Sequence, residues 1–451
     1  MPSPLAEAFT AACRADPGAP VAWTCHQVHD RAVLAAAAQQ WLACGDWPTG
    51  ARYAVSVRDP FRLLAAVLAI WLRDGCAVLL DAADPQAPRR DLALRFGAVA
   101  ILTDEPEPAC LPLAGAVAAG GYAAIKLTSG STDLPRGIGV TAAALVADCE
   151  QLERTMGIGA GDRVFAAVPM SFSYGVGNLL VPALWHGRAL VLPDARHPLG
   201  VLQALRDGQP TVLPAVPALL RALVQNAREL PASLRLVLSA GAVLPRDVAA
   251  AVRTRFGRAV HAFYGSTESG GICYDVTGSA AEVGSVGAPV HGVDVSLAAD
   301  GRVVVRSGAV GDSLDGSGNP AGGTFHAPDL GEWRDGSLVL LGRVGEVFDV
   351  GGHKVHPREI EQLVAELPGV LEVVVVPWRD ADGRASCAAL VAADGIDELA
   401  VRRHCASRLP AAKVPRCVCV VRELPRSSRG KLQRAEVERL LAAVDPAAGA
   451  G

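Results

Sequence analysis

The 451-residue sequence lacks the features that would place it on a membrane or on nucleic acid. Its formal net charge is −4 and no block of five or more like charges occurs, so nothing in the composition attracts an anionic polymer or membrane. The most apolar stretch, residues 63–72, lies between Arg62 and Arg73 and is too short to span a bilayer. The first residues, which include Glu7, lack the basic and apolar regions of a signal peptide. We therefore expect a cytoplasmic protein with neither nucleic acid nor membrane as a partner.

The sequence also lacks a cysteine pattern that would predict a metal site or a disulfide framework. It contains 11 cysteines, but no Cys-x-x-Cys pair and no cluster of Cys and His with the spacing of a zinc site. Cys417 and Cys419 are the closest pair, and their alternation places both thiols on one face of a predicted strand. Reduced and mostly buried cysteines are expected.

Lysine is scarce. Of 42 basic residues only four are lysine, namely Lys126, Lys354, Lys413 and Lys431. A lysine that persists in such an arginine-rich sequence is a candidate for a role that needs a compact ammonium group rather than a planar guanidinium. For any one of the four, chance is an equally good explanation.

Apolar strand-like runs alternate with Ala- and Leu-rich helical stretches over about the first three-quarters of the chain, which is typical of an α/β fold. The runs are short, apolar and not alternating, as buried parallel strands are. The predicted strands cover 52–57, 77–80, 163–168, 189–192, 212–214 and 236–239, and a helix is predicted over 61–74.

From about Val286 the pattern changes to short β segments, and after Arg343 a compact tail follows. The tail is predicted to contain helices over 357–367 and 396–409 and strands over 372–376, 385–391 and 416–421. The predicted class is therefore α/β, with a large N-terminal domain of mixed or parallel sheets and helices, over 1–343. A hinge joins it to a small α+β C-terminal domain over 344–451.

The first segment that could carry chemistry extends from Lys126 to Gly137 and contains a run of Thr, Ser and Gly over 128–132. Such a run bends tightly and presents amides and hydroxyls to phosphate oxygens. It lacks the Gly-Lys-Ser/Thr of a Walker loop, so that phosphate motif is excluded. Taken alone, a run of this kind is more often a solvated turn.

The second segment contains Tyr264, Thr267 and Glu268. An aromatic side chain next to a glycine can stack on a flat base, a threonine can bond a phosphate, and a glutamate supplies the hard oxygen ligands that magnesium prefers. The alternative is a loop with one surface carboxylate.

Further candidates lie toward the C-terminus. Asp329 is predicted in a loop before Trp333, where an Asp is normally a turn-former, although a buried Asp could bind two ribose hydroxyls. Lys431 is predicted on a glycine-containing loop beyond the last strand of the small domain. An ammonium group there could neutralise charge on a phosphoryl group, or it could simply be solvated.

Each segment is weak alone, but their order and separations together resemble the adenylate-forming superfamily. That superfamily includes acyl- and aryl-CoA ligases, peptide-synthetase adenylation domains and firefly luciferase, and the resemblance covers residues 46–434. It implies an acid–thiol ligase that uses ATP and Mg²⁺ to form an acyl-adenylate and pyrophosphate. The acyl group then passes to the thiol of CoA or of a carrier protein's phosphopantetheine arm. Carboxylate attack on phosphate brings two anions together, so cations and oriented dipoles must offset the repulsion.

The resemblance also implies a role for each matched residue. Thr267 contacts the α-phosphate, Glu268 holds the magnesium ion and Tyr264 stacks on the adenine ring, while Lys431 bridges the acid and the α-phosphate. The residues implied to bind ATP and AMP are Thr128, Ser129, Gly130, Ser131, Thr132, Arg136, Gly241, Ala242, Tyr264, Gly265, Asp329 and Arg343. The small domain would rotate at Gly345, withdraw Lys431 and bring Gly351 and Gly352 beside the thiol.

The sequence predicts only part of the pocket that binds the acid. By resemblance it is bordered by Phe172, Ser173, Tyr174, Gly175, Val216 and Gly270. Amino-acid-activating members carry an Asp in the segment 169–175, and none is present here, so an α-amino acid is not expected. Many ligases for aromatic acids carry His where Phe172 stands. The apolar wall suits a flat aromatic or modest aliphatic acid.

Three positions depart from the usual family pattern. Asp133 replaces a glycine of the phosphate loop, Gly345 replaces the Asp or Lys of the hinge, and Ala327-Pro328 precede Asp329 in place of Thr-Gly. Three hypotheses therefore stay open: a ligase with CoA as acceptor, the same adenylation with a carrier protein as acceptor, and a non-catalytic nucleotide-binding protein on the same scaffold.

Overall fold

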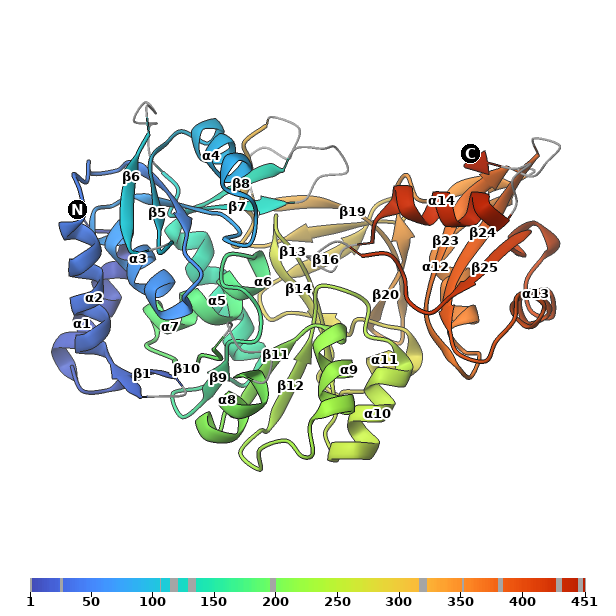
Figure 1. Ribbon diagram of the computed structural model, residues 1–451, viewed down its shortest axis with the longest axis horizontal. Coiled ribbons are helices and arrows are strands. Elements are labelled where there is room, and N and C mark those ends of the chain that lie inside the picture. Colours follow the sequence, from blue (N-terminus) through green and yellow to red (C-terminus); the bar gives the residue numbers. More distant parts are fainter. Residues whose placement is uncertain are drawn as a thin grey trace. The chain divides into compact units, whose positions relative to one another are not determined.

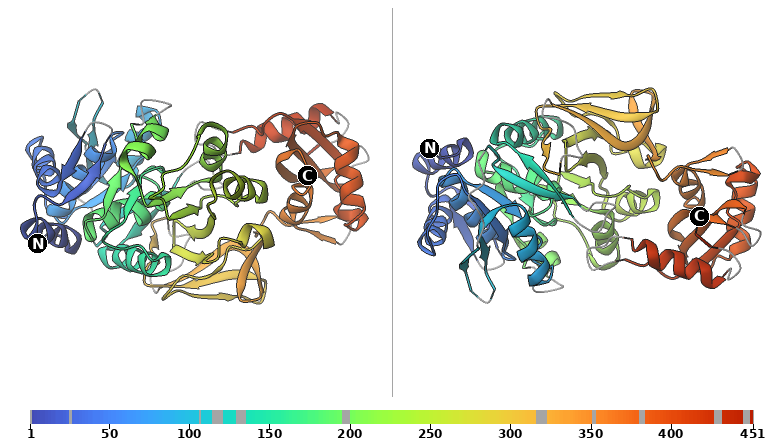
Figure 2. Two further views of the ribbon diagram at one scale, coloured as in Figure 1. Left: turned by 90° about the horizontal axis from the view of Figure 1, so that it is seen from below. Right: turned by 90° about the horizontal axis from the view of Figure 1, so that it is seen from above.

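A computed structural model of the chain describes residues 2–24, 27–105, 107–113, 121–128, 135–194, 200–315, 323–350, 353–379, 384–426, 432–444 and 449–450. Its α/β ribbon is shown in Figures 1 and 2. The chain divides into two compact units. The first comprises Met1–Ser296, Val304–His326 and Trp333–Leu338, and the second comprises Leu297–Val303, Ala327–Glu332 and Val339–Gly451.

The first unit contains a seven-stranded sheet with a parallel centre. Its order is β18 (Asp312–Ser313), β8 (Arg136–Val140), β7 (Ala124–Thr128), β4 (Cys76–Leu79), β3 (Arg52–Ser56), β5 (Ala98–Thr103) and β6 (Ala109–Pro112). Strands β7, β4, β3 and β5 run parallel, whereas β18, β8 and β6 run antiparallel to their neighbours. Helices α1 (Pro4–Ala15), α2 (Arg31–Ala43), α3 (Pro60–Leu72) and α4 (Gln86–Arg95) belong to the same part of the chain. Residues 63–71 of α3 are all buried, as the apolar run predicts.

The second sheet of this unit has nine strands. Its order is β15 (Ala288–Pro289), β14 (Gly270–Tyr274), β13 (His261–Ser266), β12 (Leu236–Ser239), β11 (Val212–Ala215), β9 (Arg163–Phe165), β10 (Ala189–Val191), β1 (Pro20–Trp23) and β2 (Val28–Asp30). The six strands from β13 to β1 are parallel. Helices α8 (Gly200–Gly208), α9 (Pro217–Asn226) and α10 (Arg246–Phe256) follow β10, β11 and β12, and α9 contacts α10 (Figure 1). Phe165, Leu213, Leu220, Val237 and Val248 form part of the core shared by these strands and helices.

Helix α5 (Ala142–Met156) is capped at its N-terminus by Thr141, whose hydroxyl accepts a hydrogen bond from the backbone N–H of Ala144. A second helical stretch is continuous through α6 (Ser173–Gly175), the π-helical turn η1 (Val176–Leu180) and α7 (Val181–Trp185). Helix α5 contacts β14, η1 and α7. It therefore connects the nine-stranded sheet to the segment predicted to border the acid. A four-residue helix, α11 (Ala280–Val283), follows β14.

A four-stranded sheet contributes residues to both units, in the order β16 (Asp294–Leu297), β17 (Arg302–Arg306), β19 (Thr324–Arg334) and β20 (Ser337–Arg343). Strand β19 corrects one expectation, because Asp329 lies inside an eleven-residue strand rather than in a loop. From Phe325 to Asp329 the strand alternates buried and exposed residues, and Asp329 is on the buried face. Pro328 belongs to its exposed face.

The second unit contains a four-stranded sheet in the order β25 (Cys417–Val421), β24 (Ala385–Ala393), β23 (Val370–Arg379) and β26 (Gly449–Ala450), and a hairpin of β21 (Phe348–Val350) and β22 (His353–Val355). Its helices are α12 (Pro357–Val364), α13 (Glu398–Ala406), the short η2 (Ala411–Lys413) and α14 (Arg434–Val444). One side of the sheet packs with Ile360 and Val401, and the other packs with Val437 and Leu441. Cys417 and Cys419 lie on the α14 side, whereas Val418 lies on the other, so the prediction for the two thiols is confirmed.

The predicted α/β class, with large N-terminal sheets and a small α+β C-terminal part, is confirmed. The placement of the domain boundary at Arg343 stays a prediction. All ten cysteines of the described residues are free and most are buried, as expected. Among the described residues, no helix has both the length and the apolar character needed to cross a membrane.

Candidate active site

The carboxyl ends of four neighbouring parallel strands gather most of the residues predicted for the acid and the adenine. Strands β9, β11, β12 and β13 are adjacent in this order, and Ala215 pairs with Ser239, which in turn pairs with Ala262 (Figure 1). In open α/β sheets, ligands bind at such an edge. The residues that follow these strands there are Phe172, Ser173, Tyr174, Gly175, Val216, Gly241 and Ala242, whereas Tyr264 and Gly265 lie near the end of β13 itself.

The segment after β12 lies against the segment after β11. Gly241 has a φ of +80°, a conformation that favours glycine, and a Cβ built on it would lie 3.5 Å from Cγ1 of Val216. Ser239, the last residue of β12, is 2% exposed, and its hydroxyl has no hydrogen-bond partner among the described residues. A buried hydroxyl of this kind is available to a ligand.

The turn between β13 and β14 is held by hydrogen bonds within it and by one from Gly311. The register shifts between Tyr264 and Gly265, and a Cβ on Gly265 would lie 2.7 Å from the carbonyl oxygen of Gly270. The hydroxyl of Ser266 accepts a hydrogen bond from the backbone N–H of Ser269 at 3.1 Å. The Glu268 carbonyl accepts from the Gly311 N–H at 2.8 Å. The turn therefore presents Thr267 and Glu268, both partly exposed, from a fixed backbone.

Strands β7 and β8 form the hairpin that carries the predicted phosphate loop. Thr128 and Arg136 are opposite each other where the loop leaves and re-enters the sheet. The Thr128 hydroxyl is buried and has no partner among the described residues. The loop residues between them, Ser129, Gly130, Ser131 and Thr132, lie outside the described residues, as does the departure at Asp133.

The predicted acid-bordering residues differ in their exposure. Tyr174 is half-buried with a buried hydroxyl, its ring centroid lies 5.8 Å from that of Phe263 on β13, and burial raises the pKa of Tyr174. Gly175 cannot carry a side chain, because a Cβ would overlap the carbonyl group of Pro169. Ser173 is half-buried, whereas Phe172 is 37% exposed. Phe172 is therefore the least enclosed member of the predicted apolar wall.

Asp329 and Arg343 belong to the second unit and contact each other. Oδ1 of Asp329 accepts a hydrogen bond from Nε of Arg343 at 3.0 Å, and Asp329 is 8% exposed. Gly345 follows with a φ of +88°, and no atom of the described residues lies within 4 Å of a Cβ built on it. The remaining predicted residues of this part, Gly351, Gly352 and Lys431, lie outside the described residues.

The structure also brings two residues to this region that the sequence reasoning did not assign to the acid or the nucleotide. Asp148 on α5 accepts a hydrogen bond through Oδ1 from the backbone N–H of Gly271 at 2.9 Å. Lys126 on β7 is 3% exposed and is within electrostatic reach of Asp148 and Glu268. Burial lowers the pKa of Lys126, and the two carboxylates oppose that shift. The sequence could have drawn attention to Asp148, because this acidic residue lies between Leu145 and Leu152 on the apolar stripe of a helix.

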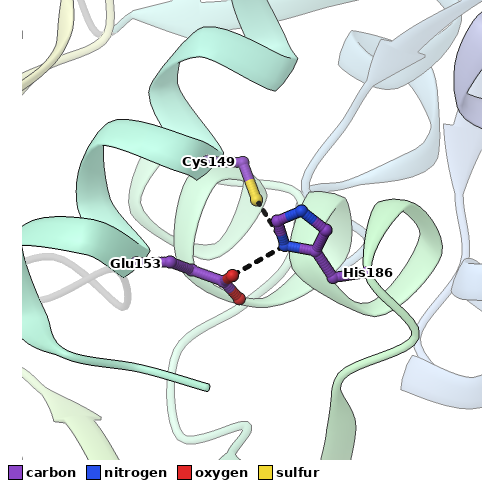
Figure 3. A group of neighbouring side chains, drawn as sticks. All are labelled: Cys149, Glu153 and His186. Carbon is purple, nitrogen blue, oxygen red and sulfur yellow. Dashed lines mark hydrogen bonds and ion pairs between the residues drawn. The ribbon is translucent and has the colours of Figure 1, made fainter. Parts of the chain in front are cut away.

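One group of His, Cys and acidic side chains among the described residues could hold a metal ion by distance alone, namely Cys149, Glu153 and His186 (Figure 3). The Nδ1 atom of His186 lies 2.6 Å from Oε2 of Glu153 and 4.0 Å from the Cys149 sulfur. Glu153 is also held by Arg188, whose Nε and Nη2 donate to its two oxygens at 2.6 and 2.7 Å. Burial raises the pKa of the Cys149 thiol. Because Arg188 and His186 already contact both oxygens of Glu153, we interpret the group as an ion-pair network between α5 and the segment after α7.

Comparisons with known proteins agree with this geometry. The chain matches the family described as "AMP-binding enzyme" over residues 105–312 and the "AMP-binding enzyme C-terminal domain" over residues 359–431. It is 33% identical over 339 residues to a 4-hydroxybenzoate–CoA/benzoate–CoA ligase of Rhodopseudomonas palustris, covering 68% of this chain and 62% of that protein. It is 30% identical over 335 residues to a benzoate–CoA ligase of Thauera aromatica, covering 68% and 64%. The chain thus spans less than two thirds of the length of these relatives.

The same fold occurs in solved structures of lower identity. The o-succinylbenzoate CoA synthetase of Bacillus subtilis, in complex with its acyl-adenylate intermediate, matches with a TM-score of 0.84 at 22% identity, over 97% of this chain and 98% of that chain. The ATP-bound form of MatB from Rhodopseudomonas palustris matches with a TM-score of 0.80 at 23% identity, over 97% and 99%.

Proposed function

Because the chain belongs to the AMP-binding enzyme family, we propose that it activates a small carboxylic acid with ATP and magnesium and then transfers the acyl group to CoA. The activation joins the acid to the α-phosphate as an acyl-adenylate and releases pyrophosphate. The curated relatives named above are ligases that join aromatic acids to CoA, which supports an aromatic acid and CoA here. We further propose that the protein works in the cytoplasm.

The observation that carries this proposal is the convergence at the carboxyl ends of β9, β11, β12 and β13. There the residues predicted to border the acid follow β9 and β11, and residues predicted to bind the nucleotide follow β12 or lie near the end of β13, on neighbouring strands of one sheet. Carboxylate attack on a phosphoryl group requires the acid and the nucleotide to be bound next to each other. A surface with unrelated functions has no need of this arrangement.

The residues present fit ATP. The buried hydroxyls of Thr128 and Ser239 lack partners among the described residues, as groups that bind a ligand would in its absence. Glu268, on its rigid turn, would hold the magnesium ion, which neutralises phosphate charge when bound. Tyr264 would stack on the base, and Asp329, fixed by Arg343, would bind the ribose hydroxyls.

Pyrophosphate exchange into ATP tests the first half of the proposal. We expect exchange that depends on one class of acid in a panel of benzoates, cinnamates, short fatty acids and amino acids. If no acid in the panel supports exchange although ATP still binds, the result would favour a non-catalytic nucleotide-binding protein. Supplying either CoA or a phosphopantetheinylated carrier protein then identifies the acceptor, and product formed only with the carrier would replace CoA in the proposal.

Lys431 provides the sharper test of mechanism. Lys431→Ala should lower exchange by a factor of about 10² or more, because a positioned cation on developing charge has an effect of that order. Thioester formation from supplied acyl-adenylate should stay close to wild type. Lys413→Ala is the matched control, since Lys413 is one of the four lysines but is already paired with Glu359 at 2.6 Å. Equal loss in both half-reactions would contradict the role of Lys431.

A further inference from the structure

The segment 311–314, which contains β18, is hydrogen-bonded to two parts of the chain that are predicted to bind the metal ion and the phosphates. At one end, the Gly311 N–H donates to the carbonyl oxygen of Glu268 at 2.8 Å. At the other end, the Leu314 N–H donates to the carbonyl oxygen of Gly137 at 2.9 Å. Between these bonds β18 pairs antiparallel with β8. The segment therefore joins the turn between β13 and β14 to β8, and all of these residues belong to the first compact unit.

The two joined parts have to meet around one magnesium ion. Strand β8 begins at Arg136, where the predicted phosphate loop re-enters the sheet, and Glu268 is the predicted magnesium ligand. Magnesium requires near-octahedral ligands at about 2.0–2.1 Å, so it tolerates little error in the position of a carboxylate relative to the phosphates. The position of the Glu268 turn relative to β8 is therefore a condition for magnesium binding.

A side-chain hydrogen bond also holds this segment. Tyr122, which lies just before β7, donates its hydroxyl hydrogen to Oδ2 of Asp312 at 2.9 Å. The Tyr122 ring lies over Gly139 of β8, because a Cβ built on Gly139 would come within 2.8 Å of the ring. Asp312 pairs with the same Gly139. Tyr122 therefore reaches across β8 to β18, over a position that glycine leaves open.

This hydrogen bond is a substantial part of what fixes β18. The strand has only two residues, so its pairing with β8 supplies few backbone hydrogen bonds. Burial raises the pKa of the Tyr122 hydroxyl, and the hydrogen bond to Asp312 raises it further. The hydroxyl therefore keeps its proton at neutral pH. Its bond to a carboxylate is stronger than a bond between two neutral groups.

We propose that Tyr122 and Asp312 are positioning residues for the magnesium site: their hydrogen bond fixes β18 on β8, and β18 holds the backbone of Glu268 in place relative to the phosphate loop. This inference rests on the proposed function. Both residues act through the backbone of Glu268, so their loss should weaken the use of magnesium with ATP. The acid and the transfer to the thiol should be affected little, because neither depends on the triphosphate.

Tyr122→Phe tests this most directly, because it keeps the ring over Gly139 and removes only the hydroxyl. The magnesium concentration that gives half-maximal pyrophosphate exchange at fixed ATP should rise about 10-fold, the lower end of the effect seen for residues behind a metal ligand. KM for the acid should stay within about 2-fold of wild type. Thioester formation from supplied acyl-adenylate should also stay close to wild type. An unchanged magnesium requirement would overturn the inference.

Tyr53→Phe is the matched control. Tyr53 is on β3 of the same seven-stranded sheet, and its hydroxyl donates to the carbonyl oxygen of Pro48 at 3.1 Å. This variant also removes one tyrosine hydrogen bond from the sheet, but it leaves the segment 311–314 intact. If both variants raise the magnesium requirement equally, or if Tyr122→Phe lowers both half-reactions alike, the bond only stabilises the sheet and the inference is wrong.

Substitutions of Asp312 test whether the hydrogen bond itself acts. Asp312→Ala should match Tyr122→Phe, and the double variant should be no worse than either, because each change removes the same bond. Asp312→Asn keeps a side-chain oxygen for the Tyr122 hydroxyl and should recover most of the loss. Additive losses, or an Asn variant as impaired as the Ala variant, would overturn the inference. The Asp312 variants provide the comparison should Tyr122→Phe fail to fold.

Equilibrium binding of ATP with and without magnesium separates failure of this inference from failure of the proposed function. Magnesium-dependent ATP binding that weakens in Tyr122→Phe but not in Tyr53→Phe supports the inference even if no acid gives exchange, and then only the proposed reaction fails. Exchange whose magnesium dependence is the same in wild type and Tyr122→Phe rejects the inference alone. A wild-type protein that neither binds ATP nor catalyses exchange rejects both.

Discussion

Nε of Arg343 donates a hydrogen bond to Oδ1 of Asp329 at 3.0 Å, across the neighbouring strands β20 and β19. The two partners differ sharply in exposure: the Asp329 side chain is 11% exposed and that of Arg343 is 61% exposed. The guanidinium therefore orients a nearly buried carboxylate from the solvent side, which is the arrangement expected of a carboxylate that binds ribose hydroxyls.

Asp329→Ala should raise KM for ATP by about 10-fold to 100-fold, because hydrogen bonds to a charged group are each worth about 1.5–3 kcal/mol. The control is Asp300→Ala, which breaks an ion pair of the same type, with Nε of Arg302 at 2.7 Å, at the turn between β16 and β17 of the same sheet. Steady-state kinetics with varied ATP provide the measurement. A change in KM shared by both variants would mean that Asp329 acts through the sheet rather than on the nucleotide.

Gly345 has a φ of +88° and open space around its Cβ position, so only backbone strain opposes a side chain there. Gly345→Ala should therefore cost about 1 kcal/mol of strain in this conformation. If Gly345 is the hinge, the overall rate of thioester formation should change by about 5-fold while pyrophosphate exchange changes less. Gly336→Ala is the control, because Gly336 has a φ of +77° and the same open surroundings. If both variants change the rate of thioester formation equally, Gly345 is not the hinge.

Much of the fold could be predicted because buried parallel strands appear in the sequence as short apolar runs. The run 236–239 coincides with β12, and the apolar stretch after Arg62 is the buried face of α3. Strand β19 could not be predicted in the same way, since Pro328 and Gly331 within it are typical of turns. Pairing with β17 and β20 overrides that local preference.

The candidate site could be predicted less completely than the fold, because its contacts join distant parts of the chain. The motif around Thr267 and Glu268 is recognisable from adjacent residues alone. The hydrogen bond from the Gly271 N–H to Asp148 depends on how α5 packs on β14, and no spacing in the sequence encodes that. Likewise Cys149 and Glu153 are one helical turn apart, but His186 joins them only in the folded chain.

The network around Glu153 should contribute stability and bind no metal. The side chains of Glu153 and Arg188 are 9% and 12% exposed, so Glu153→Gln leaves a guanidinium buried without its charge partner. We expect a loss of about 3–5 kcal/mol in the free energy of unfolding, and a smaller loss when Arg188→Gln is combined with it. Urea denaturation of the single and double variants measures this coupling. A midpoint of wild type that rises with zinc and falls with EDTA would instead indicate a metal site.

Glu361 should make the stability of the chain fall as the pH rises above 4.5. Burial raises the pKa of Glu361 to about 7, against the opposing hydrogen bond that Oε1 accepts from the Val375 N–H at 2.9 Å. The folded state therefore binds a proton more tightly than the unfolded state does. The contribution of Glu361 to the stability of the folded state is most favourable below the pKa of the unfolded state. This contribution decreases until the pH passes about 7.

Glu361→Gln removes this titration, so the variant should be more stable than wild type at pH 8, by roughly 3 kcal/mol at most. The advantage should vanish near pH 4.5, where the wild-type carboxyl is protonated when folded. Urea denaturation at several values between pH 4.5 and 8 gives the comparison. Unfolding is followed by tryptophan fluorescence, to which Trp378 of the C-terminal sheet contributes. Glu366→Gln is the control, since the Glu366 side chain is 51% exposed. A variant that is less stable than wild type at pH 8 would show that the charged carboxylate, through its bond to Val375, stabilises the C-terminal sheet.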